Sequence, residues 1–255
     1  MKAAALHFFA VALVDAGLLG MVGGALCVLV PLRFLGIGTR PRGVALFAVA
    51  SAAAAIGMLL PAPLEHVDHA RTDLDRAMPE WQFRERHRTR IHASPERVYD
   101  AIRTVTAGEV ALLRTLTWIR SPHIGAARES ILNPPADEPI YDVAVRSGFI
   151  RLSDAPPREV VLGTIVAGRV RDLHGEPAAA SLIALSTPGF AKAALNFRVE
   201  PVGPGVCELT TETRVFATDP RTARVFGSYW RVIYPGSALI RVMWLRAIRL
   251  RAERQ

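Results

Sequence analysis

The hydrophobic pattern begins with two long apolar runs that are separated by a short basic connector. Residues 3–30 contain no Lys or Arg and a single acid, and residues 44–60 contain no charge. A helix of the first length spans a hydrocarbon core, and one of the second length is near the minimum. Gly20 and Gly24 form a small-xxx-small pair that allows close helix packing. The sequence therefore predicts a transmembrane helical hairpin over residues 1–62, because the first run is longer than the apolar part of a cleaved signal peptide.

The charges that flank the two runs predict the orientation of the hairpin. Arg33, Arg40 and Arg42 stand in the connector without an acid, whereas only Lys2 and the terminal amine precede the first run. Cytoplasmic loops of membrane proteins carry the excess of positive charge. We therefore expect a protein of the cell membrane with a cytoplasmic connector and an extracytoplasmic soluble domain after residue 61.

Residues 83–102 change from the periodicity of a strand to that of a helix. Successive side chains of a strand point to opposite faces, which separates Phe83, Glu85, His87, Thr89 and Ile91 from Arg84, Arg86, Arg88 and Arg90. The triplet Ser94-Pro95-Glu96 then combines a hydroxyl N-cap, a proline at N1 and an acid in the first turn. The pattern predicts a strand over residues 83–91 and a helix from Pro95 to about Val105.

The pattern of the remaining residues predicts a second helix, a series of strands and one long helix. Residues 63–80 are polar and predict a linker or a short helix, and residues 109–120 predict a helix. Asp219-Pro220 starts a helix with apolar positions every three or four residues to Ala247, which Pro235 should kink or interrupt. The strand-like segments are residues 143–152, 159–170, 193–201 and 206–217, with a shorter apolar run at 181–186.

This order of elements, together with the phrase IHASPERVYDAI at residues 91–102, resembles the START-like, or SRPBCC, superfamily. The resemblance covers roughly residues 81–251, and the Pro-rich passage 121–139 departs from it. It implies an α+β helix-grip domain over residues 81–255, in which an antiparallel sheet wraps around the long C-terminal helix and encloses an apolar cavity. Members of the superfamily bind lipids, sterols, polyketides or plant hormones, and some are polyketide cyclases.

Composition narrows the class of partner. The net charge is +8, and residues after 60 hold 27 basic against 22 acidic residues, or +5. Nucleic-acid binding needs a concentrated basic patch with stacking aromatic residues, which this spread of arginines lacks, whereas contact with anionic lipid headgroups suits it. We predict no cofactor and no metal: Cys27 and Cys207 form no zinc motif, and the possible ligands in residues 65–69 lie in a solvated segment beside the membrane.

The candidate site combines polar and aromatic residues. Glu85 and His87 share the strand face away from the arginines, so they can form an acid/base pair, orient the polar end of a lipid, or make a structural pair with Arg214 or Arg198. Tyr229 and Trp230 on the C-terminal helix line the same pocket or belong to the core.

Three functions follow from this reading. The first is a membrane-anchored START-like domain that binds a hydrophobic or lipid-like small molecule in an internal cavity through Glu85, His87, Tyr229 and Trp230. The second is a cyclase- or hydrolase-type enzyme that uses Glu85 and His87. The third is a structural module of the cell envelope that binds no ligand. Fold resemblance alone does not choose among them.

Overall fold

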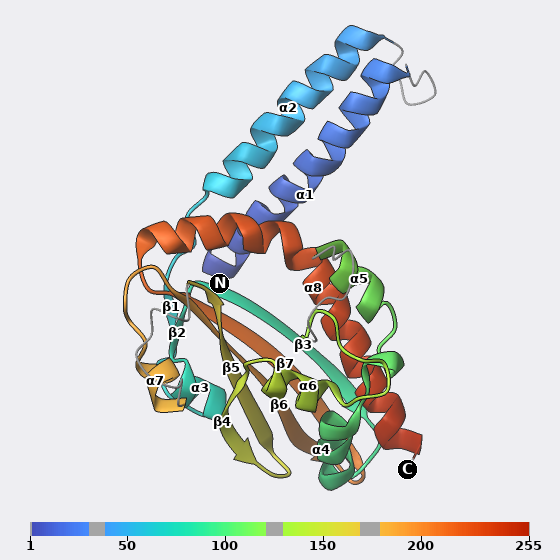
Figure 1. Ribbon diagram of the computed structural model, residues 1–255, viewed down its shortest axis with the longest axis vertical. Helices are drawn as coiled ribbons and strands as arrows, with labels where there is room; N and C mark the ends of the chain where they lie inside the picture. Colours follow the sequence, from blue (N-terminus) through green and yellow to red (C-terminus); the bar gives the residue numbers. More distant parts are fainter. Residues whose placement is uncertain (1, 31–38, 121–129, 169–178, 255) are drawn as a thin grey trace. The chain divides into compact units, whose positions relative to one another are not determined.

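The computed structural model describes residues 2–30, 39–120, 130–168 and 179–254 (Figure 1). The chain divides into two compact units. The first consists of Met1–Pro63 with Arg224–Tyr234, and the second of Leu64–Ala223 with Pro235–Gln255. The long C-terminal helix α8 (Pro220–Arg254) therefore contributes to both.

The first unit contains the two apolar helices, α1 (Lys2–Leu29) and α2 (Arg40–Leu59). Their segments Ala5–Leu29 and Arg40–Leu59 are long and apolar enough to cross a membrane. The predicted small-residue contact is present, because a Cβ atom at Gly24 would lie 2.7 Å from the backbone nitrogen of Phe47, and one at Gly20 would lie 2.8 Å from the Cβ of Ala50. Arg33 lies outside the described residues, and the orientation of the hairpin stays a prediction.

The second unit is built on a five-stranded antiparallel sheet of order β3-β7-β6-β5-β4, so the predicted α+β class is confirmed. A separate antiparallel pair is formed by β1 (Glu65–His66) and β2 (Glu80–Trp81). The strands of the main sheet are β3 (Phe83–Ile91), β4 (Ile150–Ala155), β5 (Glu159–Ala167), β6 (Ala191–Gly203) and β7 (Val206–Ala217). Strand β3 lies at the edge of the sheet, where its exposed arginines oppose pairing with another chain.

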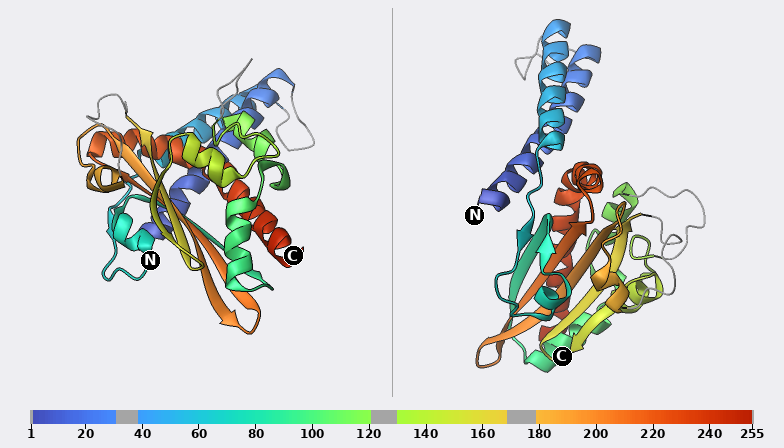
Figure 2. Two further views of the ribbon diagram at one scale, coloured as in Figure 1. Left: turned by 60° about the horizontal axis from the view of Figure 1, so that its bottom comes forward. Right: turned by 90° about the vertical axis from the view of Figure 1, so that its left-hand side faces the viewer.

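Each face of the sheet is covered by helices. On one face, which we call the inner face, Val160 packs with α4 (Pro95–Thr104) and with the part of α8 that belongs to this unit. Figure 2 shows α4 and this part of α8 on the same side of the strands. On the outer face, Val161 packs with α3 (Asp73–Ala77), as expected for successive residues of a strand. The remaining helices are η2 (Ala107–Glu109), α5 (Leu113–Arg120), α6 (Ile140–Arg146) and α7 (Ala179–Ala184).

The start of α4 follows the predicted capping pattern. The Ser94 hydroxyl accepts a hydrogen bond from the Arg97 amide at 3.4 Å, and Pro95 occupies the first turn. The prediction for β3 is also confirmed, since Phe83, Glu85 and Ile91 are buried while Arg86, Arg88 and Arg90 are exposed.

Two sequence predictions were wrong in part. Residues 143–146 belong to α6 rather than to a strand, because buried Ile140, Tyr141, Val143 and Ala144 have helical spacing. The apolar run at 181–186 lies largely in α7. Helix α8 is continuous through Pro235, where the boundary between the units falls, so of the two predicted effects the interruption is not seen and the kink stays a prediction. Proline has no amide hydrogen, so it removes one hydrogen bond of the helix at this position.

Candidate functional site

Glu85 and His87 lie on the inner face of β3, and Glu85 contacts the C-terminal helix. Glu85 is only 3% exposed. Its Oε1 lies 2.9 Å from His87 Nε2, and its Oε2 accepts a hydrogen bond from Ser237 Oγ at 2.8 Å. Thr213 stands opposite Glu85 on β7 and accepts a hydrogen bond from Arg241 of α8 at 3.0 Å. These five side chains, which we call the Glu85 cluster, join the edge of the sheet to α8.

The predicted approach of Glu85 to His87 is therefore confirmed, but its predicted arginine partners are wrong. Arg214 lies on the outer face and pairs with Asp75 and Glu212. Arg198 pairs with Glu200. Sequence reasoning missed Ser237 because its contact with Glu85 joins residues that are 152 positions apart.

The hydrogen bonds of the Glu85 cluster satisfy the buried carboxylate. Ser237 donates a hydrogen bond to Glu85 Oε2, and the acid/base role of Glu85 and His87 stays a prediction. Within the described part of the chain, no hydrogen bond joins His87 to Ser237. Glu85 instead bridges the two side chains, which satisfies a carboxylate that is buried between strand and helix.

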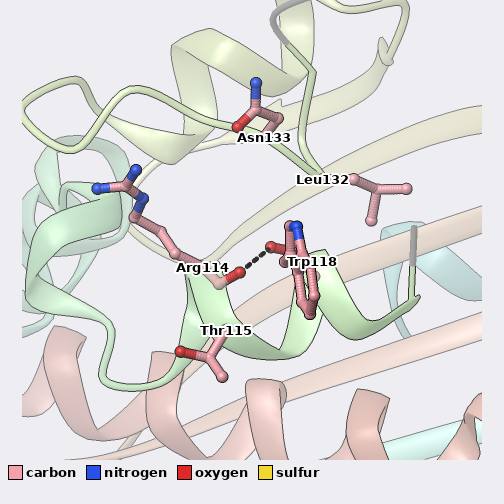
Figure 3. A pocket seen from close by; sticks show the side chains of 6 residues that line it. Arg114, Thr115, Trp118, Leu132 and Asn133 are labelled. Atoms are coloured by element: carbon pink, nitrogen blue, oxygen red, sulfur yellow. Dashed lines mark hydrogen bonds between the residues drawn. The ribbon is translucent and has the colours of Figure 1, made fainter. Parts of the chain in front are cut away.

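A pocket of about 420 Å³ lies beside α5. It is lined by Arg114, Thr115, Thr117, Trp118, Leu132 and Asn133 (Figure 3). Trp118 and Leu132 supply apolar surface, while Arg114 and Asn133 supply hydrogen-bond donors and one positive charge. The Thr117 hydroxyl is engaged by the carbonyl oxygens of Leu113 and Arg114, at 2.8 and 3.2 Å. A volume of this size lies within the usual range of small-molecule sites.

Local structure explains how the chain forms this pocket. Leu112 has φ of 61°, a left-handed conformation that costs a leucine about 1–2 kcal/mol, and α5 starts directly after it. Arg114 and Trp118 are four residues apart and therefore lie on one face of the helix. The opposite wall is a short turn, in which the Asn133 amide donates to the Ser130 carbonyl at 2.8 Å.

None of the four sequence-predicted site residues lines this pocket. Glu85 and His87 belong to the Glu85 cluster, and Tyr229 and Trp230 belong to the first unit. Trp230 is buried with its ring centroid 6.0 Å from that of Phe226 and 6.1 Å from that of Tyr234, and Tyr229 is exposed. Their role in ligand binding stays a prediction. The one sequence signal for the pocket was Trp118, on a predicted helix that precedes the Pro-rich passage 121–139. Residues 121–129 of this passage lie outside the described part of the chain.

A buried charge network occupies the outer face, under α3. Arg214 donates to Asp75 at 2.7 Å, to Glu212 at 2.7 Å and to the Met78 carbonyl at 3.0 Å. Its guanidinium carbon lies 4.1 Å from the centroid of the Trp81 ring. Burial alone raises the pKa of Asp75, but hydrogen bonds from the Arg71 amide and from Arg214 outweigh it and hold the pKa below its usual value.

Glu159 extends this network to the start of α3. Its carboxylate accepts hydrogen bonds from the amides of Asp73 and Leu74, at 2.9 and 3.2 Å, and from the Asn196 side chain at 2.7 Å. The first amides of a helix have no partner within the helix, so Glu159 supplies one for each of these two. Segment 64–81, which follows the second apolar helix, is thus held against the sheet.

Among the residues that the structure describes, no group of three or more His, Cys, Asp or Glu side chains could hold a metal ion. In the juxtamembrane segment, His66 Nε2 lies 3.4 Å from Asp68 Oδ1, and both side chains are exposed.

Comparison with known proteins gives no match: no family model, no curated protein and no solved structure is significantly similar to the chain. The resemblance to the START-like superfamily consequently stays a prediction, beside an observed architecture that includes a five-stranded antiparallel sheet and a long C-terminal helix.

Proposed function

We propose that the protein is a membrane-anchored domain that binds a lipid-like, amphipathic small molecule in the pocket beside α5. The observation that carries the proposal is the composition of this pocket, which places Trp118 and Leu132 next to Arg114 and Asn133. Apolar walls with a few polar groups are typical of ligand sites. An acyl chain or a fused ring system would lie against the indole, and an anionic or hydroxylated end would face the guanidinium.

The exposure of Trp118 allows the gain from binding to be estimated. The residue is 53% exposed, but only part of this surface lines the pocket, so a ligand there removes roughly 50 Å² of the on the order of 200 Å² that a buried tryptophan covers. At about 25 cal/mol per Å² this contributes about 1.2 kcal/mol. Arg114 adds charge-assisted hydrogen bonding for an anionic group.

The two apolar helices support the membrane anchor. Both are long enough to span a hydrocarbon core, and the arginine-rich composition favours a surface of anionic headgroups. In this proposal residues 1–62 form the anchor and residues after 61 are extracytoplasmic. The domain that starts at residue 81 is a START-like helix-grip domain in which the pocket beside α5 holds the ligand.

Mass spectrometry of small molecules that co-purify with the detergent-extracted full chain tests the proposal. We expect an amphipathic molecule to accompany the natural protein and to be lost from the Trp118→Ala variant. Ile119→Ala is the matched control, because Ile119 is an exposed neighbour on α5 that does not line the pocket. Retention of the same molecule by Trp118→Ala, or its absence from all three proteins, would overturn the assignment of the pocket.

A further inference from the structure

The pocket beside α5 has a polar end and an apolar end. Figure 3 shows the guanidinium of Arg114 on one side of the pocket and Leu132 on the opposite side, with the Trp118 ring toward Leu132. Asn133 lies on the wall between the two ends. All four residues belong to the second unit. A ligand that follows this arrangement has its polar group at Arg114 and its apolar part against Trp118 and Leu132.

The guanidinium of Arg114 is unpaired. Among the described residues that line the pocket, no other side chain carries a charge. Within the described part of the chain, no carboxylate pairs with this guanidinium and no hydrogen bond engages it. Asp137, which follows Asn133 by four residues, is exposed and does not pair with it. A ligand in the pocket therefore meets one positive charge that no acidic side chain satisfies.

Two carboxylates that flank the segments of the pocket are engaged by other arginines. Glu109, in η2 just before α5, accepts a hydrogen bond from Arg251 at 2.7 Å. Burial alone raises the pKa of Glu109, but hydrogen bonds that include the one from Arg251 outweigh it and hold the pKa below its usual value. Glu138, after the second wall of the pocket, pairs with Arg146. Both carboxylates are thus occupied, which leaves the charge of Arg114 for a ligand.

The size of the pocket suits one chain. At about 30 Å³ for a group of the size of water, the 420 Å³ of the pocket hold roughly 14 such groups. This room suffices for a polar group and one alkyl chain, so the second chain of a two-chain lipid would have to lie outside. The planar guanidinium of an arginine matches a carboxylate or a phosphate, which it can bind through two parallel hydrogen bonds.

We propose that the ligand of this pocket is a single-chain anionic amphiphile and that Arg114 is the residue that selects its negative charge. The carboxylate of a fatty acid and the phosphate of a lysophospholipid share the chemistry that Arg114 recognises. In either case the anionic group pairs with Arg114, the amide of Asn133 donates a further hydrogen bond, and the chain lies on Trp118. The inference rests on the proposed function, to which it adds the charge of the ligand, its number of chains and the residue that reads the charge.

The charge selection is tested by the affinity of the full chain, held in a non-ionic amphipol, for matched single-chain lipids below their micelle concentrations. Lysophosphatidylglycerol and a fatty acid are anionic, whereas lysophosphatidylcholine and a monoacylglycerol with the same acyl chain have no net charge. We expect the natural protein to bind the anionic pair about fivefold more tightly, which corresponds to about 1 kcal/mol for an ion pair at an exposed site. The tighter of the two anions identifies the source of the ligand, and either result supports the proposal.

Two variants separate the charge of Arg114 from the shape of the pocket. Arg114→Gln keeps hydrogen-bond donors at this position without the charge, so it should weaken the binding of both anions by about fivefold and leave the neutral lipids unaffected. Arg246→Gln is the matched control, because Arg246 is an exposed arginine of α8 that does not line the pocket. It should leave the preference for anions as it is in the natural protein.

The failures of the inference and of the proposed function are distinguishable. Equal affinities for anionic and neutral lipids, with binding that Trp118→Ala still weakens, would overturn the charge selection alone. A loss in Arg114→Gln that is equal for all lipids would overturn it as well, because it would indicate a role in the shape of the pocket. No saturable binding of any of these lipids would overturn the proposed function itself.

The number of chains is tested with two phosphatidylglycerols that have the same total number of acyl carbons, in one chain or in two. We expect the natural protein to bind the single-chain form more tightly, since the pocket holds only one chain. Equal affinities of the two forms would overturn the single-chain assignment.

Discussion

Replacement of Arg214 by methionine tests whether the charge network holds segment 64–81 against the sheet. Methionine keeps much of the volume of the side chain but removes three hydrogen bonds, to Asp75, Glu212 and the Met78 carbonyl. Glu212 retains Arg84, whose Nη2 donates to it at 3.1 Å. Asp75 loses the guanidinium with which it pairs while it remains buried. Removal of one partner from a buried ion pair costs about 3–5 kcal/mol, a large part of the roughly 5–15 kcal/mol that stabilises a typical domain.

Two measurements on the full chain in detergent give the result. A urea titration followed by near-ultraviolet circular dichroism reports the free energy of unfolding, and hydrogen exchange reports the protection of segment 64–81. We expect Arg214→Met to lower the free energy of unfolding by about 3–5 kcal/mol. Within segment 64–81, we expect it to accelerate hydrogen exchange most at the Leu74 and Met78 amides. Arg88→Met is the matched control, because Arg88 pairs with Glu208 at the surface, where a pair contributes about 1 kcal/mol or less.

The double variant Asp75→Asn with Arg214→Met identifies the cause of the loss. Because it removes the uncompensated carboxylate, we expect it to be less destabilised than the sum of the two single variants, by about 1–3 kcal/mol. Strict additivity would contradict the network, as would an Arg214→Met variant no less stable than Arg88→Met.

Three further outcomes follow from particular contacts. Ser94→Ala removes the N-cap of α4 and should lower the free energy of unfolding by about 1 kcal/mol, whereas an unchanged urea midpoint would refute the capping role. Gly24→Val should lower the thermal stability of the hairpin in detergent, because its Cβ would lie 2.7 Å from the Phe47 nitrogen, while Gly23→Val should not, since nothing lies within 4 Å of that position. The lowered pKa of Asp75 contributes stability that is complete above the ordinary aspartate pKa near 4 and is lost as pH falls through the lower folded value. The protection factors of segment 64–81, which take the intrinsic exchange rate at each pH into account, should therefore fall on acidification below about pH 4, and this acid-dependent fall should be smaller in Asp75→Asn.

Local patterns predicted the parts of the fold that local forces determine. The strand-to-helix change at Ser94 was correct because alternation and a capping triplet act within a few residues. The strand predicted over residues 206–217 was also correct, and its alternation places Leu209 in the inner core and Arg214 in the outer network. The second helix began later than predicted, since the left-handed Leu112 separates η2 from α5.

The candidate sites depend on contacts that no local pattern contains. Asp75 and Arg214 are separated by 139 positions and Glu85 and Ser237 by 152, so neither pairing follows from spacing along the chain. The pocket needs Leu132, which lies within the Pro-rich passage, to meet Trp118 of α5. Tyr229 and Trp230 were predicted beside Glu85 because one amphipathic stripe runs along the C-terminal helix, yet this helix contributes to both units.

The most direct test of the central claim is the affinity of the full chain for a single-chain anionic lipid, such as lysophosphatidylglycerol, below its micelle concentration. We expect saturable binding that Trp118→Ala weakens by on the order of 8-fold, from about 1.2 kcal/mol of lost burial. We also expect a further loss with Arg114→Ala and an affinity for Ile119→Ala within about twofold of the natural protein, because a residue outside the pocket contributes little. Equal affinities of Trp118→Ala and Ile119→Ala would contradict a lipid-like ligand in the pocket beside α5.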